Sequence, residues 1–348
     1  MFTLIILDCI NKLSLDRSIS GIYHMLTGKK SVQSIQDAHI FQLTAYFGIY
    51  KRLDFAEFER IITVLEREQF IAVSDNYSAV LTDKGKQYVT DKQEILNQVG
   101  LKGLKYHRMS EQFLLRLQLF CQTATNLFAG NNSFLAITDN REVQLWVKHF
   151  YHETKPDLRK CLDEMYKELK IFLSQIDQRS AELFVDRLTG FKRIALSKEQ
   201  LSKKYKKSIH EIEVQLTDIV HRLIAFILNN KQVTPFLVSF VDDLKSQMFL
   251  TDSASHTYRL YQKGLSIAEI ASTRGLKQNT IQDHIIEISY IFPELILPSF
   301  LNKEAIETIK SAMNQTNSKR LKDIKALVGD NYSYFDIRLV VAVNQMDK

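Results

Sequence analysis

Residues 265–276 read Leu-Ser-Ile-Ala-Glu-Ile-Ala-Ser-Thr-Arg-Gly-Leu, and this stretch decides the fold of the C-terminal part of the chain. We predict that Ser266 caps a short helix and that the small Ala271 lets a second helix cross closely. Gly275 is suited to the positive φ of a tight turn between them. Residues 265–287 therefore have the pattern of a helix-turn-helix, whose second helix can enter the major groove of DNA.

The second helix of this motif has polar side chains at its outward positions, while Ile281 and Ile285 face inward. Gln and Asn can pair with adenine, Lys with guanine or phosphate, and Thr with phosphate or a thymine methyl. We predict DNA contacts from the outward residues, although the same frame also occurs where such helices bind protein. The outward residues are Lys277, Gln278, Asn279, Thr280, Gln282 and His284, with Asp283 among them.

The same pattern occurs once more, 69 residues earlier (265 − 196). The stretch 196–201 reappears as 265–270, and the inward position Ile212 recurs as Ile281. Two helix-turn-helix units are therefore predicted, of which the second matches the pattern better.

The densest positive charge lies between residues 192 and 207, where seven cations face one acid, Glu199, in a chain of net charge +6. Lys and Arg side chains that contact phosphates release condensed counterions and supply most of the sequence-independent affinity for nucleic acid. The alternative is a solvated helix face. We assign DNA contacts in this segment to Lys192, Arg193, Lys203, Lys204, Lys206 and Lys207; the seventh cation is Lys198.

The order of elements over residues 36–90 predicts a winged helix. One helix is expected to close at Gly48, and a second opens with Asp54 as its N-cap. Two short strands follow at 69–73 and 78–81, joined by a turn. Helix, helix and small hairpin is the order of winged-helix domains.

Composition points to a globular, mainly helical protein. The 348 residues are 45% hydrophobic and 25% charged, and they include only 11 glycines and 4 prolines, the residues that turns consume. We predict a mainly α fold with an N-terminal winged helix, a small β-hairpin, a helical middle region and C-terminal helix-turn-helix modules. The expected domains are a winged-helix-like domain at 1–95, a helical spacer or bundle at 96–180, a basic helix-turn-helix-like region at 181–250 and a C-terminal helix-turn-helix domain at 251–348.

Several function classes are not expected. The 3 cysteines are too far apart for a zinc site or a disulfide framework, which favours a reducing, cytoplasmic interior. The apolar residues 1–7 are too few for a signal peptide or a membrane span and are expected to form a buried helix. No P-loop, nucleophile elbow or dinucleotide-binding motif occurs, and His149 and His152 lack the spacing of a zinc protease. We therefore expect no enzyme, no metal, no cofactor and no small-molecule substrate.

Both ends of the chain resemble parts of RecQ-family helicases. A resemblance to the winged-helix module after the helicase motor is carried by Gly28-Lys29-Lys30, Ile35-Gln36-Asp37-Ala38, Tyr46-Phe47-Gly48, Phe58, Ile61-Ile62, Leu65 and Leu81-Thr82-x-x-Gly85. A resemblance to the helix-turn-helix tail of bacterial RecQ-like helicases is carried by Thr257-Tyr258-x-Leu260-Tyr261-x-x-Gly264-Leu265-Ser266, Ile270-Ala271, Thr280-Ile281-x-x-His284-Ile285 and Tyr334-Phe335-Asp336-Ile337-Arg338. Both modules in one chain without a motor resemble the YpbB family of helicase-associated helix-turn-helix proteins.

The resemblance implies a DNA-binding accessory protein that acts with a RecQ-like helicase in DNA repair or recombination. The chain departs from the helicases in lacking the motor and the zinc element before the winged helix. Its presumed recognition helix near 55–68 is also rich in glutamate, which phosphate repels. Tyr77 is a candidate wing contact, but Asp75 beside it argues against close approach to DNA. The N-terminal module is therefore expected to bind protein.

Two other functions stay open. A transcription regulator would read bases with Gln278, Asn279 and Gln282 and would form a dimer that spaces two half-sites. A pure protein-interaction scaffold would bind a helicase without binding DNA itself.

Overall fold

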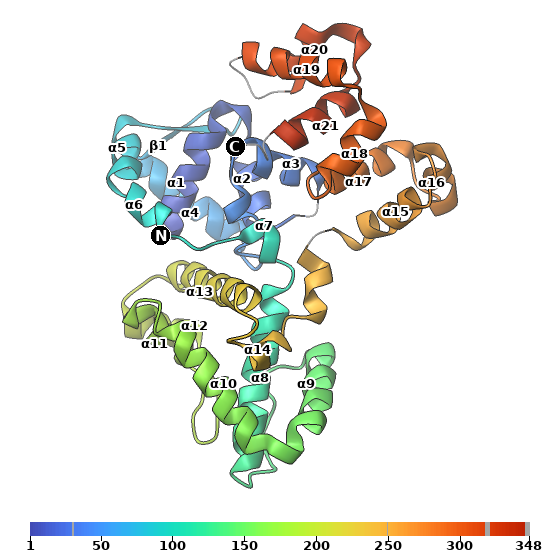
Figure 1. The fold of residues 1–348 in the computed structure, drawn as a ribbon. Helices are drawn as coiled ribbons and strands as arrows, with labels where there is room; N and C mark the ends of the chain where they lie inside the picture. The colour runs from blue at the N-terminus through green and yellow to red at the C-terminus, as the bar shows by residue number, and fades with distance from the viewer. Residues whose placement is uncertain (30, 249, 317–320, 345–348) are drawn as a thin grey trace. The chain divides into compact units, whose positions relative to one another are not determined.

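A computed structural model describes residues 1–29, 31–248, 250–316 and 321–344 (Figure 1). Helices dominate these residues, and the sheet found among them has two strands, β1 (Ile71–Val73) and β2 (Ala79–Leu81). The predicted fold class, mainly helical with a small hairpin, is confirmed. The chain divides into two compact units: unit 1 contains residues 1–2 and 94–248, and unit 2 contains residues 3–93 and the described residues from 250 onward.

The N-terminal part of unit 2 is a set of short helices around the hairpin. The apolar residues at the start of the chain form a buried helix, as predicted. Asp54 caps α4, since its side chain accepts a hydrogen bond from the Glu57 N–H at 3.1 Å. The helices of this part are α1 (Phe2–Leu13), α2 (Ile19–Thr27), α3 (Val32–Ile40), α4 (Phe55–Arg67) and α5 (Asp83–Asp91), with 3-10 turns at Ser14–Asp16 and Thr44–Tyr46.

The predicted helix that closes at Gly48 is wrong. Helix α3 ends at Ile40 because Gln42 takes a left-handed φ of 54°. The N–H groups of Gln42 and Leu43 return to the carbonyls of His39 and Ala38, which is the hydrogen-bond pattern of a Schellman helix end. The apolar residues beyond this point are buried in a 3-10 turn and a loop. Their spacing therefore reflects burial and does not indicate a helix.

The predicted hairpin is confirmed, with three residues in each strand. The strands are antiparallel, and Ile71 pairs with Leu81. Thr82 then caps α5 by accepting from the Gly85 N–H at 3.1 Å. Position 85 requires glycine, because a Cβ there would lie 2.1 Å from the Phe70 carbonyl oxygen.

The C-terminal part of unit 2 is built around α17. This helix packs against α15, α16, α18, α21 and also α3 from the N-terminal part. Its residues from Ile285 to Ser289 are all buried. The helices are α15 (Asp252–Gln262), α16 (Ile267–Arg274), α17 (Gln278–Ser289), α18 (Pro293–Phe300), α19 (Lys303–Gln315), α20 (Leu321–Val328) and α21 (Tyr334–Asn344), with a 3-10 turn at Gly329–Asn331.

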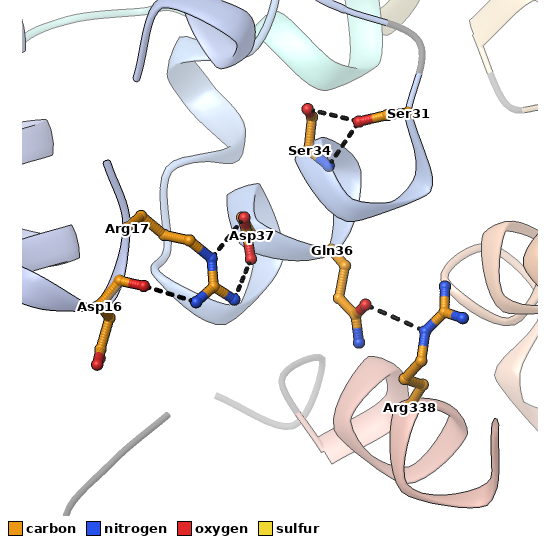
Figure 2. Close-up of polar contacts among 7 residues, drawn as sticks. All are labelled: Asp16, Arg17, Ser31, Ser34, Gln36, Asp37 and Arg338. Carbon is orange, nitrogen blue, oxygen red and sulfur yellow. Dashed lines mark hydrogen bonds and ion pairs between the residues drawn. The ribbon is translucent and has the colours of Figure 1, made fainter. Parts of the chain in front are cut away.

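Polar and aromatic contacts join α3 to the C-terminal helices within unit 2. Figure 2 shows Arg338 donating from Nε to the Gln36 Oε1 at 3.2 Å. On the other side of α3, Arg17 holds Asp37 through two hydrogen bonds of 2.8 and 2.7 Å (Figure 2). The His39 ring stacks on Tyr290, with ring centroids 3.8 Å apart. Sequences from both ends of the chain therefore share one unit.

The stacked His39 predicts a pH dependence of stability. Burial lowers the pKa of His39 to about 4 in the folded protein. As the pH falls below the ordinary value near 6.5, His39 is therefore protonated in the unfolded chain before it is protonated in the folded one. Stability contributed by neutral His39 is complete above that pH and is lost towards pH 4, at up to about 1.4 kcal/mol per pH unit. Urea unfolding at several pH values should show this loss in the parent. His39→Phe keeps the stack, so the stability difference between parent and variant should change with pH; a constant difference would contradict the assignment.

Unit 1 is a helical bundle with an aromatic core. Phe120, Trp146, Phe150, Phe236 and Phe240 contact one another with centroids 4.9–5.7 Å apart. The helices are α6 (Gln93–Asn97), α7 (Gly103–Tyr106), α8 (Ser110–Phe128), α9 (Arg141–Thr154), α10 (Leu158–Leu173), α11 (Gln178–Val185), α12 (Lys198–Tyr205), α13 (Ile209–Asn229) and α14 (Pro235–Val238), with 3-10 turns at Lys155–Asp157 and Asp243–Met248.

Candidate nucleic-acid interface

The predicted repeat is present as two helix-turn-helix units in one register. Helices α12 and α16 have eight residues each and begin 69 residues apart (267 − 198). The second helices, α13 and α17, begin at the same offset (278 − 209). Ser197 and Ser266 cap the first helices at equivalent positions, and each forms a capping box. The local signals in the sequence therefore set the same structure twice.

The turns and the inward residues of the two units also correspond. Gly275 ends α16 with a φ of 62°, as predicted, and Lys206 takes a φ of 54° at the equivalent place after α12. Ile212 and Ile281 are both fully buried. The second helices differ in length, because α13 continues to Asn229 whereas α17 ends at Ser289.

The exposed part of α17 is its beginning. Lys277, Gln278 and Asn279 are exposed, and Thr280 and Gln282 are half-buried. In helix-turn-helix proteins the N-terminal residues of the recognition helix contact the base edges. The predicted contact residues of this helix other than His284 therefore lie together at its accessible beginning.

The outward position predicted for His284 is wrong. Only 8% of this residue is exposed, and its Nδ1 lies 2.9 Å from the Thr257 hydroxyl of α15. Arg274 lies 3.3 Å from the same nitrogen, and burial together with this cation lowers the pKa of His284. Helix α15 packs against a second face of α17, and the spacing of Ile281 and Ile285 does not predict that this face is buried. Asp283 forms a 2.8 Å ion pair with Arg338 of α21.

The beginning of α13, the equivalent position in unit 1, is covered. The Phe2 N–H donates to the Glu211 carboxylate at 2.9 Å, and the Phe2 ring stacks on His210. Glu213 forms an ion pair with Lys198. Carboxylates at this helix start would repel phosphate, so the two helix-turn-helix units differ in the charge at the start of their second helix.

Asp186 organises part of the basic segment. Its buried carboxylate accepts hydrogen bonds from Arg193 at 3.2 Å, Lys204 at 2.5 Å and Tyr205 at 2.9 Å. Burial works against the charged carboxylate, but the hydrogen bonds from Lys204 and Tyr205 outweigh it and lower the pKa of Asp186 below its ordinary value. Asp186 thus joins the loop before α12 to the end of α12. Sequence reasoning missed this role, since a single acid before a basic segment is an ordinary pattern.

The cations of the segment therefore fall into two groups. Arg193 and Lys204 are tied to Asp186, and Lys207 donates to the Gln215 side chain at 2.8 Å. Lys192, Lys203 and Lys206 are exposed, and we find no ion pair for them among the described residues. The second group is the charge that remains available to an anionic partner.

Tyr77 turns back onto its own domain instead of projecting from the hairpin. Its hydroxyl donates to the Glu59 carboxylate at 2.8 Å, and its carbonyl accepts from the Ile19 N–H at 2.9 Å. Burial and the contact with Glu59 raise the pKa of Tyr77 to about 12. A side chain held in this way is not placed as a free wing tip, and exposed Asp75 lies beside it.

The two predicted DNA-contact segments belong to different units. Residues 192–207 lie in unit 1, and residues 277–282 lie in unit 2. In the described parts of the chain, no three His, Cys, Asp or Glu side chains are grouped to hold a metal ion. Nor does any described helix combine the length and apolar character needed to cross a bilayer.

Comparison with known proteins supports the helix-turn-helix. A family model described as "Helix-turn-helix domain" matches residues 253–341. The chain is similar over nearly its whole length to Protein YpbB of Bacillus subtilis (strain 168), with 27% identity over 355 aligned positions that cover 99% of each protein. No solved structure matches significantly.

Proposed function

We propose that this protein is a non-enzymatic DNA-binding accessory protein that acts with a RecQ-like helicase in DNA repair or recombination. The observation that carries the proposal is the exposed start of α17, where Lys277, Gln278 and Asn279 stand at the reading end of a helix-turn-helix. These side-chain types pair with guanine, phosphate and adenine. DNA is held by the helix-turn-helix at 265–287 together with the basic segment 192–207.

The two segments have different tasks in this proposal. The start of α17 carries the groups that read base edges, and the helix macrodipole adds a partial positive charge there. Lys203 and Lys206 near the end of α12 supply phosphate contacts, which position the protein without reading sequence. Because both segments contribute to affinity, each alone should bind DNA more weakly than the full chain.

We assign the partner contact to α4 of the N-terminal part. Glu59, Glu66 and Glu68 are exposed on or just after this helix, and their charge repels phosphate. Such a face suits a basic protein surface better than DNA. We therefore place the helicase, as the resemblance to helicase modules implies, against α4.

Reversal of two of these charges should separate partner binding from DNA binding. We expect Glu66→Lys/Glu68→Lys to weaken binding to a purified RecQ-like helicase from the same organism by more than about tenfold, as several lost charge contacts would. DNA affinity should not fall. The measurement is biolayer interferometry with immobilised helicase, with fork unwinding by the helicase as a second readout. If the parent neither binds the helicase nor changes its unwinding rate, the partner assignment is wrong.

A transcription regulator is the second candidate, because Gln278 and Asn279 are exposed and suited to adenine. Selection from random duplexes distinguishes the two functions. A palindromic site bound by a dimer would support the regulator, whereas binding that depends on DNA form and not on sequence supports the accessory role.

A further inference from the structure

The segment between α11 and α12 contains a tight turn that exposes apolar and basic side chains together. The Gly190 N–H donates to the Arg193 carbonyl at 2.9 Å, and the Arg193 N–H donates back to Gly190 at 3.0 Å. Phe191 is 39% exposed and Ile194 is 87% exposed. Lys192 and Arg193 lie between these two apolar residues in the sequence.

The turn is held firmly at its base. The Phe191 N–H donates to the Thr125 hydroxyl of α8 at 3.0 Å, and the Ala195 N–H donates to the Thr189 hydroxyl at 3.1 Å. Arg193 is tied to the Asp186 carboxylate. The exposed apolar side chains are therefore presented by a fixed backbone and not by a loose loop.

Lys192 holds a backbone conformation that lysine rarely adopts. Its φ is 57°, in the left-handed region where glycine or asparagine is less strained. Strained residues persist where the surrounding structure fixes them, and they concentrate at ligand contacts. Here the strain places a cation at the tip of the turn, with its ammonium 5.2 Å from the centroid of the Phe191 ring.

The combination selects a partner that offers anions and apolar surface side by side. A single exposed isoleucine is common on protein surfaces and carries no conclusion. Here two exposed apolar residues flank the available cation Lys192 in the sequence, and an anchored turn presents all three. Duplex DNA fits them, because its phosphates flank base steps that accept inserted apolar side chains from the minor groove.

We infer that the turn at 190–194 is a wedge that inserts into a base step of bound DNA. Ile194 and Phe191 contact the partly unstacked bases, and Lys192 contacts a neighbouring phosphate, while Arg193 stays bound to Asp186 and holds the turn. The inference rests on the proposed DNA binding and adds that the bound DNA is unstacked at one step.

Base unstacking provides the direct test. We expect the full-length parent to raise the fluorescence of 2-aminopurine at one or two positions, in a set of duplexes that carry this base at each position in turn. Phe191→Ser/Ile194→Ser should abolish the rise at saturating protein concentration. Leu135→Ser is the matched control, since Leu135 is 92% exposed in the same unit and outside the turn.

Replacement of the strained lysine gives an independent readout. Lys192→Gly removes a cation and relieves the left-handed conformation, so urea unfolding should show a more stable protein while DNA affinity at about 0.1 M salt falls by up to about tenfold. A gain in stability with unchanged affinity would overturn the phosphate contact at the tip.

The outcomes separate the wedge from DNA binding itself. Binding by the parent without any fluorescence change, or an equal change with Phe191→Ser/Ile194→Ser, overturns the wedge and leaves the proposed function standing. If the parent binds no DNA at low salt, the proposed function fails and the wedge fails with it.

Discussion

Exchange of Lys203 and Lys206 for glutamate is expected to lower DNA affinity by about two orders of magnitude at about 0.1 M salt. Both side chains are exposed and make no ion pair among the described residues, so their charge is available to phosphate. Each lost contact removes the free energy of releasing about one counterion, and each glutamate adds repulsion. The slope of log affinity against log salt should fall by about 2.

Fluorescence anisotropy with a labelled duplex measures both quantities. Lys204 and Lys207 are left unchanged because they bond to Asp186 and Gln215, so replacing them would test the fold instead of the interface. Lys148→Glu/Lys155→Glu is the control, since it makes the same change in net charge at exposed positions of the same unit. Parent-like affinity and slope in Lys203→Glu/Lys206→Glu would remove this segment from the interface.

Truncation of Ile281 to alanine is expected to lower the free energy of unfolding by about 2–5 kcal/mol. The side chain is fully buried at the start of α17, so its loss leaves a cavity beneath the residues proposed to read DNA. Ile212 occupies the equivalent buried position 69 residues earlier (281 − 212). Ile212→Ala should therefore lower the free energy of unfolding by a similar amount.

Urea unfolding of both variants tests this expectation. Gln278→Ala is the control, because its exposed side chain lies in the same helix and should change stability by less than about 0.5 kcal/mol. A loss below about 1 kcal/mol in both isoleucine variants would contradict the assignment of these residues to the two helix-turn-helix cores.

The sequence predicted the helix-turn-helix well because its signals are local. A serine cap and a glycine at the turn act within 265–276, and both are seen in the structure, where the small Ala271 is buried. The repeat could be predicted for the same reason, since equivalent caps and inward residues recur at a fixed offset.

The errors concern contacts that the local sequence does not encode. His284 is buried by α15, whose position depends on the fold of the whole C-terminal part. Helix α3 ends at Ile40 because Gln42, which is not a glycine, takes a positive φ, and the sequence carries no sign of it. The role of Asp186 could not be predicted because its three donors, Arg193, Lys204 and Tyr205, come together only through the fold of the loop before α12.

Salt-dependent binding of the full chain to labelled duplex, forked and single-stranded DNA tests the central claim most directly. We predict binding to duplex or fork with a steep negative slope of log affinity against log salt, as expected from several phosphate contacts in the basic segment and at α17. The absence of binding to all three DNAs at low salt would contradict the claim and would leave a protein-interaction scaffold as the function.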